Sequence, residues 1–120
     1  MKKTVIIGAT PNPSRYAFFA AQRLTEHGHE IIPLGIKKGE VGNGVKIINE
    51  KPHIDNVDTV TMYVGPGHQE NWMDYIISLQ PKRIIFNPGT ENEVFYEKLR
   101  QENIFFEEAC TLVMLSAKTY

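Results

Sequence analysis

The chain has 120 residues but only one cysteine, Cys110, and only one tryptophan, Trp72. A single cysteine excludes a disulfide within the chain and is typical of a reducing compartment. The cysteine and the four histidines do not follow the spacing of a zinc site. We therefore expect a cytoplasmic protein with no disulfide and no metal centre.

Neither sign of charge is in excess, since 13 Lys and Arg oppose 14 Asp and Glu for a formal net charge of -1. Such a chain has no general electrostatic attraction to nucleic acid or to a membrane surface. Long apolar runs are also missing, and none approaches the roughly 20 residues of a membrane span. The first residues do not follow a signal-peptide pattern. We expect neither nucleic acid nor membrane as a partner.

What is present is the composition of a folded globular protein, with 42% hydrophobic and 22% charged residues. A chain of this length is most simply one domain, here residues 1–120, with no internal repeat or linker. We expect a single compact unit with its own core.

Short apolar runs rich in β-branched residues alternate with stretches of helical periodicity. We predict strands at 4–7, 30–34, 59–64, 83–86 and 104–106, and helices at 14–27, 69–79 and 91–102. Residues 45–48 have the pattern of a short extended segment, and the apolar run 110–117 is too short to distinguish helix from strand. Alternation of this kind indicates right-handed crossovers and a parallel sheet covered on both faces. The predicted fold is a Rossmann-like α/β three-layer sandwich with five, or at most six, parallel strands.

The stretch from Val5 to Ser14 is the most informative part of the chain. An apolar strand ends at Gly8, and small, turn-forming residues lead into a helical pattern. A nucleotide-binding strand–loop–helix begins in this way, because glycine permits a close approach of the backbone and the following helix N-terminus attracts an anion. Thr10 and Pro13 replace the second and third glycines of G-x-G-x-x-G. The sequence therefore predicts a phosphate-binding loop that differs from a standard NAD site.

Small, polar and cationic residues follow the other predicted strands as well. Because the carboxyl ends of parallel strands meet at one edge of the sheet, these residues are candidates for one ligand site. Glycine and proline also end strands in α/β proteins that bind nothing. The candidates are Gly8, Ala9, Thr10, Asn12, Ser14, Arg15, Pro33, Leu34, Lys37, Lys38, Gly65, Asn87, Pro88 and Gly89.

The end of the second strand separates the ligand classes. An NAD site needs a carboxylate there to accept hydrogen bonds from the ribose, but the first acidic residue after this strand is Glu40. Lys37 and Lys38 would instead suit a ribose that carries a phosphate, as in coenzyme A (CoA) or NADP. The alternative is an ordinary pair of solvated lysines.

Two segments resemble the opening of CoA-binding Rossmann domains, namely Gly8–Tyr16 and Glu26–Leu34. This family includes small stand-alone bacterial proteins, to which the chain is most similar, and the N-terminal domain of the succinyl-CoA ligase α subunit. The similarity continues through Phe86–Asn92 and Glu108–Thr111. It implies that CoA or an acyl-CoA is the ligand.

The resemblance also implies roles for individual residues. Gly8, Thr10, Asn12, Ser14 and Arg15 would meet the pyrophosphate, Pro33 and Leu34 would flank the adenosine, and Lys37 or Lys38 would lie near the 3′-phosphate. Many stand-alone members have Asn-Pro after the second strand, where this chain has Gly35-Ile36. The phosphohistidine of the ligase belongs to a second domain, so its chemistry does not transfer to this chain.

No residues form a recognisable catalytic set. Cys110 follows two glutamates, which disfavour a thiolate, and His68 is a lone loop histidine. The sequence favours a ligand-binding module without its own catalysis. The alternatives are an NADP-linked reductase with Tyr63 or His68 as proton donor, an acyl-CoA-transforming enzyme that acts with a partner, and an interaction domain with a vestigial site. Apolar residues in excess of a core (Phe18, Phe19 and Trp72) are compatible with a homodimer or a partner enzyme.

Overall fold

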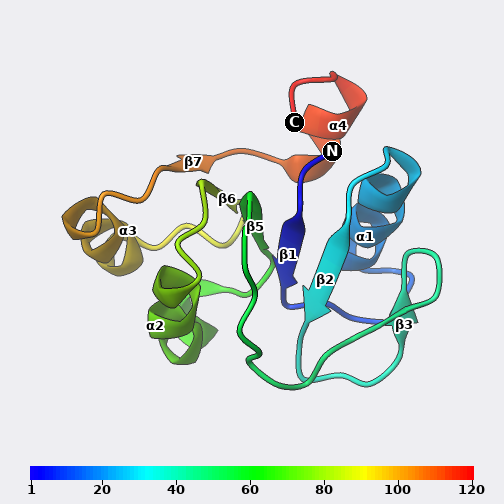
Figure 1. Cartoon of the computed structure of the whole chain (residues 1–120), viewed down its shortest axis with the longest axis horizontal. Coiled ribbons are helices and arrows are strands. Elements are labelled where there is room, and N and C mark those ends of the chain that lie inside the picture. Colours follow the sequence, from blue (N-terminus) through cyan, green and yellow to red (C-terminus); the bar gives the residue numbers. More distant parts are fainter.

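The computed structural model describes all 120 residues and contains a five-stranded sheet in the order β2-β1-β5-β6-β7 (Figure 1). Its strands are β1 (Thr4–Ile7), β2 (Ile31–Leu34), β5 (Thr59–Met62), β6 (Arg83–Phe86) and β7 (Phe106–Glu108). Every neighbouring pair is parallel. The predicted Rossmann-like α/β fold is confirmed, with five strands in the sheet.

Helices cover both faces of this sheet. They are α1 (Tyr16–Glu26), α2 (Glu70–Ser78), α3 (Glu93–Gln101) and α4 (Thr111–Ser116). Figure 1 shows α1 and α4 on one side and α2 and α3 on the other. No helix is both long and apolar enough to span a bilayer.

The four-residue strands β1, β2, β5 and β6 are rich in apolar residues because both of their faces pack against helices. Successive residues of β1 therefore enter different cores: Val5 and Ile7 pack with α2 and α3, whereas Ile6 packs with Leu24 of α1 and Leu115 of α4. All four residues of β1 and of β5 are buried. Burial on both faces explains why β1 has no alternation of apolar and polar residues, whereas β5 alternates threonine with Val60 and Met62, and both of its threonines are buried and hydrogen-bonded.

Several elements differ from the sequence prediction. The last strand begins at Phe106 rather than 104, and the ambiguous run 110–117 contains helix α4. The predicted extended segment 45–48 contains β4 (Val45–Lys46), but β4 pairs with an unpredicted strand, β3 (Glu40–Val41), in a small antiparallel hairpin. A short 3-10 helix, η1, covers Pro66–His68. Such short elements depend on tertiary contacts and have little local signal.

The helix predicted at 91–102 begins at Glu93 in the structure, as α3, and its N-cap is Asn92. The Asn92 side chain accepts hydrogen bonds from the backbone of Val94 (3.1 Å) and Phe95 (3.3 Å). The Thr90 hydroxyl instead donates to the Asn87 carbonyl at 2.7 Å. Thr90 thus stabilises the loop that precedes the helix.

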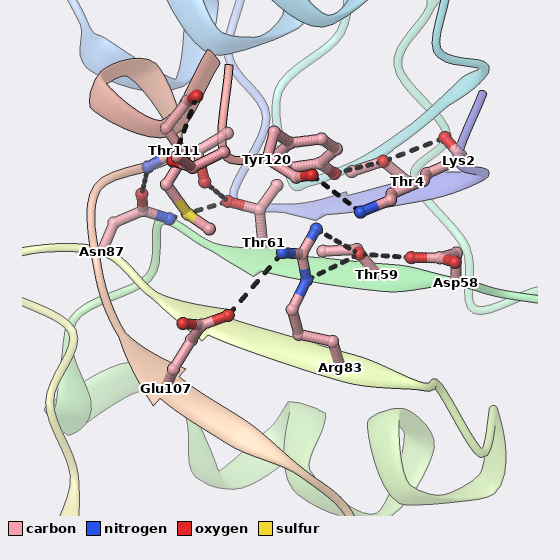
Figure 2. A network of polar contacts seen from close by, with 12 residues as sticks. Lys2, Thr4, Asp58, Thr59, Thr61, Arg83, Asn87, Glu107, Thr111 and Tyr120 are labelled. Atoms are coloured by element: carbon pink, nitrogen blue, oxygen red, sulfur yellow. Dashed lines mark hydrogen bonds and ion pairs between the residues drawn. The ribbon is translucent and has the colours of Figure 1, made fainter. Parts of the chain in front are cut away.

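The C-terminal residue is attached to the amino ends of the strands (Figure 2). The Tyr120 hydroxyl is hydrogen-bonded to Thr4, and its carbonyl accepts from the Lys2 ammonium at 2.7 Å. The Arg83 guanidinium lies 4.6 Å from the centre of the Tyr120 ring and also donates to the Thr59 hydroxyl. This network closes the edge of the sheet opposite to the carboxyl ends.

His29 belongs to the same end of the molecule and generates a prediction on pH. Its ring lies 4.9 Å from that of Tyr120, and its Nδ1 accepts the backbone N–H of Lys2 at 2.9 Å. Burial, followed by nearby positive charge, lowers the pKa of His29 below its ordinary value. Its contribution to stability is therefore complete above pH ~6.5, the pKa in the unfolded chain, and is lost as the pH falls toward the folded-state pKa.

We expect the free energy of unfolding of the wild type to fall more than that of His29→Gln between pH 7.5 and 5. Urea titrations at both pH values measure this difference. Equal losses of unfolding free energy in the two proteins would contradict a lowered pKa of His29, since the other three histidines are common to both.

Candidate functional site

A cavity of about 1120 Å³ opens at the carboxyl ends of the strands. It lies where the chain leaves β1 toward β2 on one side and later returns to β5 on the other, which is the topological switch point of the sheet. Four loops line it, one after each of β1, β2, β5 and β6. The lining residues fall within the segments 8–17, 35–37, 63–72 and 88–90.

The loop after β1 begins with a glycine that no other residue can replace without strain. Gly8 has φ +96°, and a Cβ there would lie 2.8 Å from Cγ2 of Val64 and 2.9 Å from the Tyr63 carbonyl oxygen. The N–H groups of Gly8 and Ala9 both donate to the Leu34 carbonyl, at 2.9 Å each. Gly8 is therefore required by the tight junction of three strands as well as by the cavity.

The N-terminus of α1 leaves hydrogen-bond donors free at the cavity. Its N-cap, Arg15, makes no capping hydrogen bond through its side chain, in contrast to Asn92 at α3. The backbone N–H groups of Tyr16 and Ala17 have no acceptor in the chain, and both residues line the cavity together with Arg15. Free N–H groups, the helix dipole and a guanidinium form a site that attracts an anion.

Other polar groups of this loop determine its own shape. The Asn12 side-chain oxygen accepts from both the N–H (3.0 Å) and the hydroxyl (2.8 Å) of Ser14, and the Thr10 hydroxyl accepts the N–H of Asn12 at 3.2 Å. Thr10 and Asn12 line the cavity, whereas Ser14 does not. Ser14, a candidate for a phosphate contact, thus closes a turn with Asn12 just before the N-terminus of α1.

At the end of β2, the residues that line the cavity are not the ones that the sequence suggested. Pro33 and Leu34 are buried in the strand and do not line the cavity, so their side chains cannot flank an adenosine there. Gly35, Ile36 and Lys37 line it instead. The cavity wall on this side is thus formed by the residues directly after β2, which ends at Leu34.

The two lysines of this loop differ in position. Lys37 lines the cavity, whereas Lys38 does not. Both are exposed, and neither forms an ion pair. Of the two, Lys37 is therefore the candidate for a ligand phosphate.

Gly65, Pro88 and Gly89, three of the ligand-site candidates from the sequence, line the cavity, but Asn87 does not. The Asn87 amide group donates to the Thr61 hydroxyl (2.7 Å) and the Met62 carbonyl (2.8 Å), and its oxygen accepts the N–H of Thr111 at 2.8 Å (Figure 2). Asn87 is only 2% exposed. It attaches the start of α4 to β5 rather than contacting a ligand.

The sequence prediction missed the contribution of α2. Trp72, interpreted as a core or subunit residue, lines the cavity together with Glu70 and Asn71. The Lys51 ammonium lies 5.1 Å from the centre of the Trp72 ring. The sequence contained only a general indication of this position, because the first-turn residues of any helix that follows a parallel strand lie at the carboxyl edge of the sheet. Glu70 is the one carboxylate among the lining residues.

The residues considered for catalysis do not form a reactive pair. The Tyr63 hydroxyl oxygen is buried and has no hydrogen-bond partner, and burial raises the pKa of this hydroxyl far above its ordinary value. His68 lies exposed at the cavity, and Cys110 is half-buried at the start of α4, outside the lining. A buried phenol that holds its proton so tightly is a poor proton donor.

The sequence of residues 2–116 matches the model of a CoA binding domain. The chain belongs to this family of CoA-binding domains. A crystal structure of an uncharacterized protein is 59% identical, with a TM-score of 0.96 over 100% of this chain and 98% of the other. No curated protein matches.

More distant structures share the fold alone. A Thermus thermophilus protein is 20% identical, with a TM-score of 0.87 over 99% of this chain and 90% of its own. A hypothetical protein from Pyrococcus horikoshii OT3 is 24% identical, with a TM-score of 0.87 over 97% of this chain and 82% of its own. The architecture of this CoA-binding domain thus persists at low sequence identity.

Asn87→Ala tests the structural role of this side chain. We expect the free energy of unfolding to fall by about 3 kcal/mol, because three hydrogen bonds among buried groups are lost. Chemical denaturation measures the loss, with the exposed Asn43→Ala as control. A stability equal to that of the control would contradict this role.

Proposed function

We propose that this domain binds CoA or an acyl-CoA in the cavity at the carboxyl ends of the strands, as a ligand-binding module without catalysis of its own. Family membership supports CoA as the ligand class. The observation that carries the proposal is the uncapped N-terminus of α1, where free N–H groups and Arg15 adjoin the cavity. This position suits the pyrophosphate of the ligand.

The loop after β2 supports the phosphorylated ribose of CoA. The cavity wall formed by residues 35–37 contains Lys37 and no carboxylate. A ribose with free hydroxyls would instead require an acidic residue at this wall. An ammonium with no ion pair can interact with a 3′-phosphate at full charge. Lys37 is thus the residue proposed to distinguish CoA from dephospho-CoA.

The opposite wall supports the less charged part of the ligand. It is formed by Val64, Gly65, His68 and Trp72, which offer apolar surface and a few polar groups. A cavity of about 1120 Å³ is at the upper end of small-molecule sites, as an extended ligand requires. We place the pantetheine arm along this wall.

Catalysis is left out of the proposal because no nucleophile and base lie together in the cavity. The buried Tyr63 hydroxyl retains its proton, and Cys110 lies outside the lining. A reductase would need a proton donor in contact with the substrate. The arrangement favours binding over turnover.

Calorimetric titration with CoA, dephospho-CoA, NADP and NAD tests the proposal. We expect CoA to bind most tightly, dephospho-CoA less tightly, and NAD least. A preference for NADP would favour the reductase, and the absence of binding by all four would favour an interaction domain.

Lys37→Ala should weaken CoA binding about tenfold and dephospho-CoA binding by less than about twofold, because only CoA carries the 3′-phosphate. Lys38→Ala is the matched control and should leave both affinities unchanged, since Lys38 lies outside the cavity lining. Equal losses for the two ligands with Lys37→Ala would show that this lysine does not read the phosphate.

Gly65→Val should fill part of the cavity without disturbing the fold. Its backbone conformation is accessible to any residue (φ -64°, ψ 159°), and a Cβ there has no atom within 4 Å. We expect CoA affinity to fall at least about tenfold with an unchanged melting temperature. Wild-type affinity in this variant would place the ligand elsewhere.

A further inference from the structure

The residues 35–39, here the Lys37 loop, are held by the chain segment that follows the β3–β4 hairpin. The N–H of Gly35 donates to the Ile48 carbonyl at 3.1 Å, and the N–H of Ile47 donates to the Gly39 carbonyl at 2.9 Å. Ile48 also forms a parallel bridge with Leu34. Both ends of the Lys37 loop are therefore attached to the segment 47–48.

Asn49 attaches the middle of the loop. Its side-chain nitrogen donates to the carbonyl of Gly35 and to the carbonyl of Lys37, at 2.8 Å each. A primary amide has two N–H bonds, and this arrangement uses both. Asn49 is itself exposed and does not line the cavity, so it has no ligand contact of its own.

The other side of the loop packs against the phosphate-binding loop. A Cβ on Gly39 would lie 2.7 Å from Cβ of Pro11, and one on Gly35 would lie 2.5 Å from the Ala9 carbonyl oxygen. The Lys37 loop is thus enclosed between the loop after β1 and the Asn49 amide. The Asn49 hydrogen bond is the one side-chain contact that reaches the backbone of Lys37 itself.

Lys37 depends on the support of its backbone because no other group of the chain holds its side chain. Its ammonium has no carboxylate or carbonyl partner in the chain. A long, flexible side chain loses conformational freedom when it binds a phosphate, and a backbone that is already in place reduces the loss. Movement of the Lys37 backbone would therefore weaken the interaction directly.

We propose that Asn49 is a positioning residue that holds Lys37 toward the ribose phosphate of the ligand. This inference rests on the proposed function and extends it to a residue outside the cavity. In this arrangement Lys37 supplies the positive charge, and the Asn49 amide holds the Lys37 backbone in place.

The test is a double-mutant cycle with Asn49→Ala, Lys37→Ala and the double variant, each titrated with CoA and with dephospho-CoA. We expect Asn49→Ala to weaken CoA binding about fivefold to tenfold and dephospho-CoA binding by less than about twofold. In the Lys37→Ala background the same change should have no further effect on CoA. Asn43→Ala, on the exposed turn of the hairpin, is the matched control and should bind as the wild type does.

Equal losses for the two ligands, a loss that persists without Lys37, or no loss at all would each overturn the inference. If Asn49→Ala melts at a lower temperature, Asn49→Ser is compared in the same way and must show the same selective loss. Failure of the proposed function is a different result, because the wild type would then bind neither CoA nor dephospho-CoA.

Discussion

The junction at Gly8 and Ala9 is the contact on which the rest of the site depends. Two consecutive N–H groups donate to one carbonyl, that of Leu34, while Gly8 packs directly against the backbone after β5. β1, β2 and β5 are therefore connected at the topological switch point, where the strand order reverses. Because the chain turns so tightly there, α1 starts beside the cavity, and the residues with free N–H groups, Tyr16 and Ala17, line it.

The polar groups at the amino ends of the strands have partners within the chain, whereas several at the carboxyl ends do not. At the amino ends, Tyr120, Thr4, Arg83 and Thr59 satisfy one another's hydrogen bonds and fix the C-terminus (Figure 2). At the carboxyl ends, donors and cations are left without partners. A folded chain tolerates such groups only where solvent or a ligand reaches them. This contrast is a physical reason to place the ligand at the carboxyl edge that is independent of the family comparison.

Sequence reasoning located the cavity well but assigned its residues unevenly. Gly8, Arg15, Lys37 and Gly89, all candidates from the sequence, line it: Gly8 directly follows β1, Arg15 directly precedes α1, and the other two lie in the loops after β2 and β6. Asn87 occupies a similar place in the sequence, but its side chain turns into the protein toward Thr61 and Thr111. A sequence pattern specifies where the backbone turns; it does not specify on which side of the turn a side chain finds its partners.

The sequence by itself determined the order of strands and helices along the chain, the parallel sheet and the glycine turn that leads from β1 into α1. These follow from periodicity and from local backbone preferences, which short segments carry alone. Tertiary structure alone decided that Lys37 and not Lys38 lines the cavity, that Trp72 forms part of its wall, and that Asn49 supports the Lys37 backbone. Each of these depends on contacts between residues distant in sequence, and such contacts exist only once the sheet has assembled.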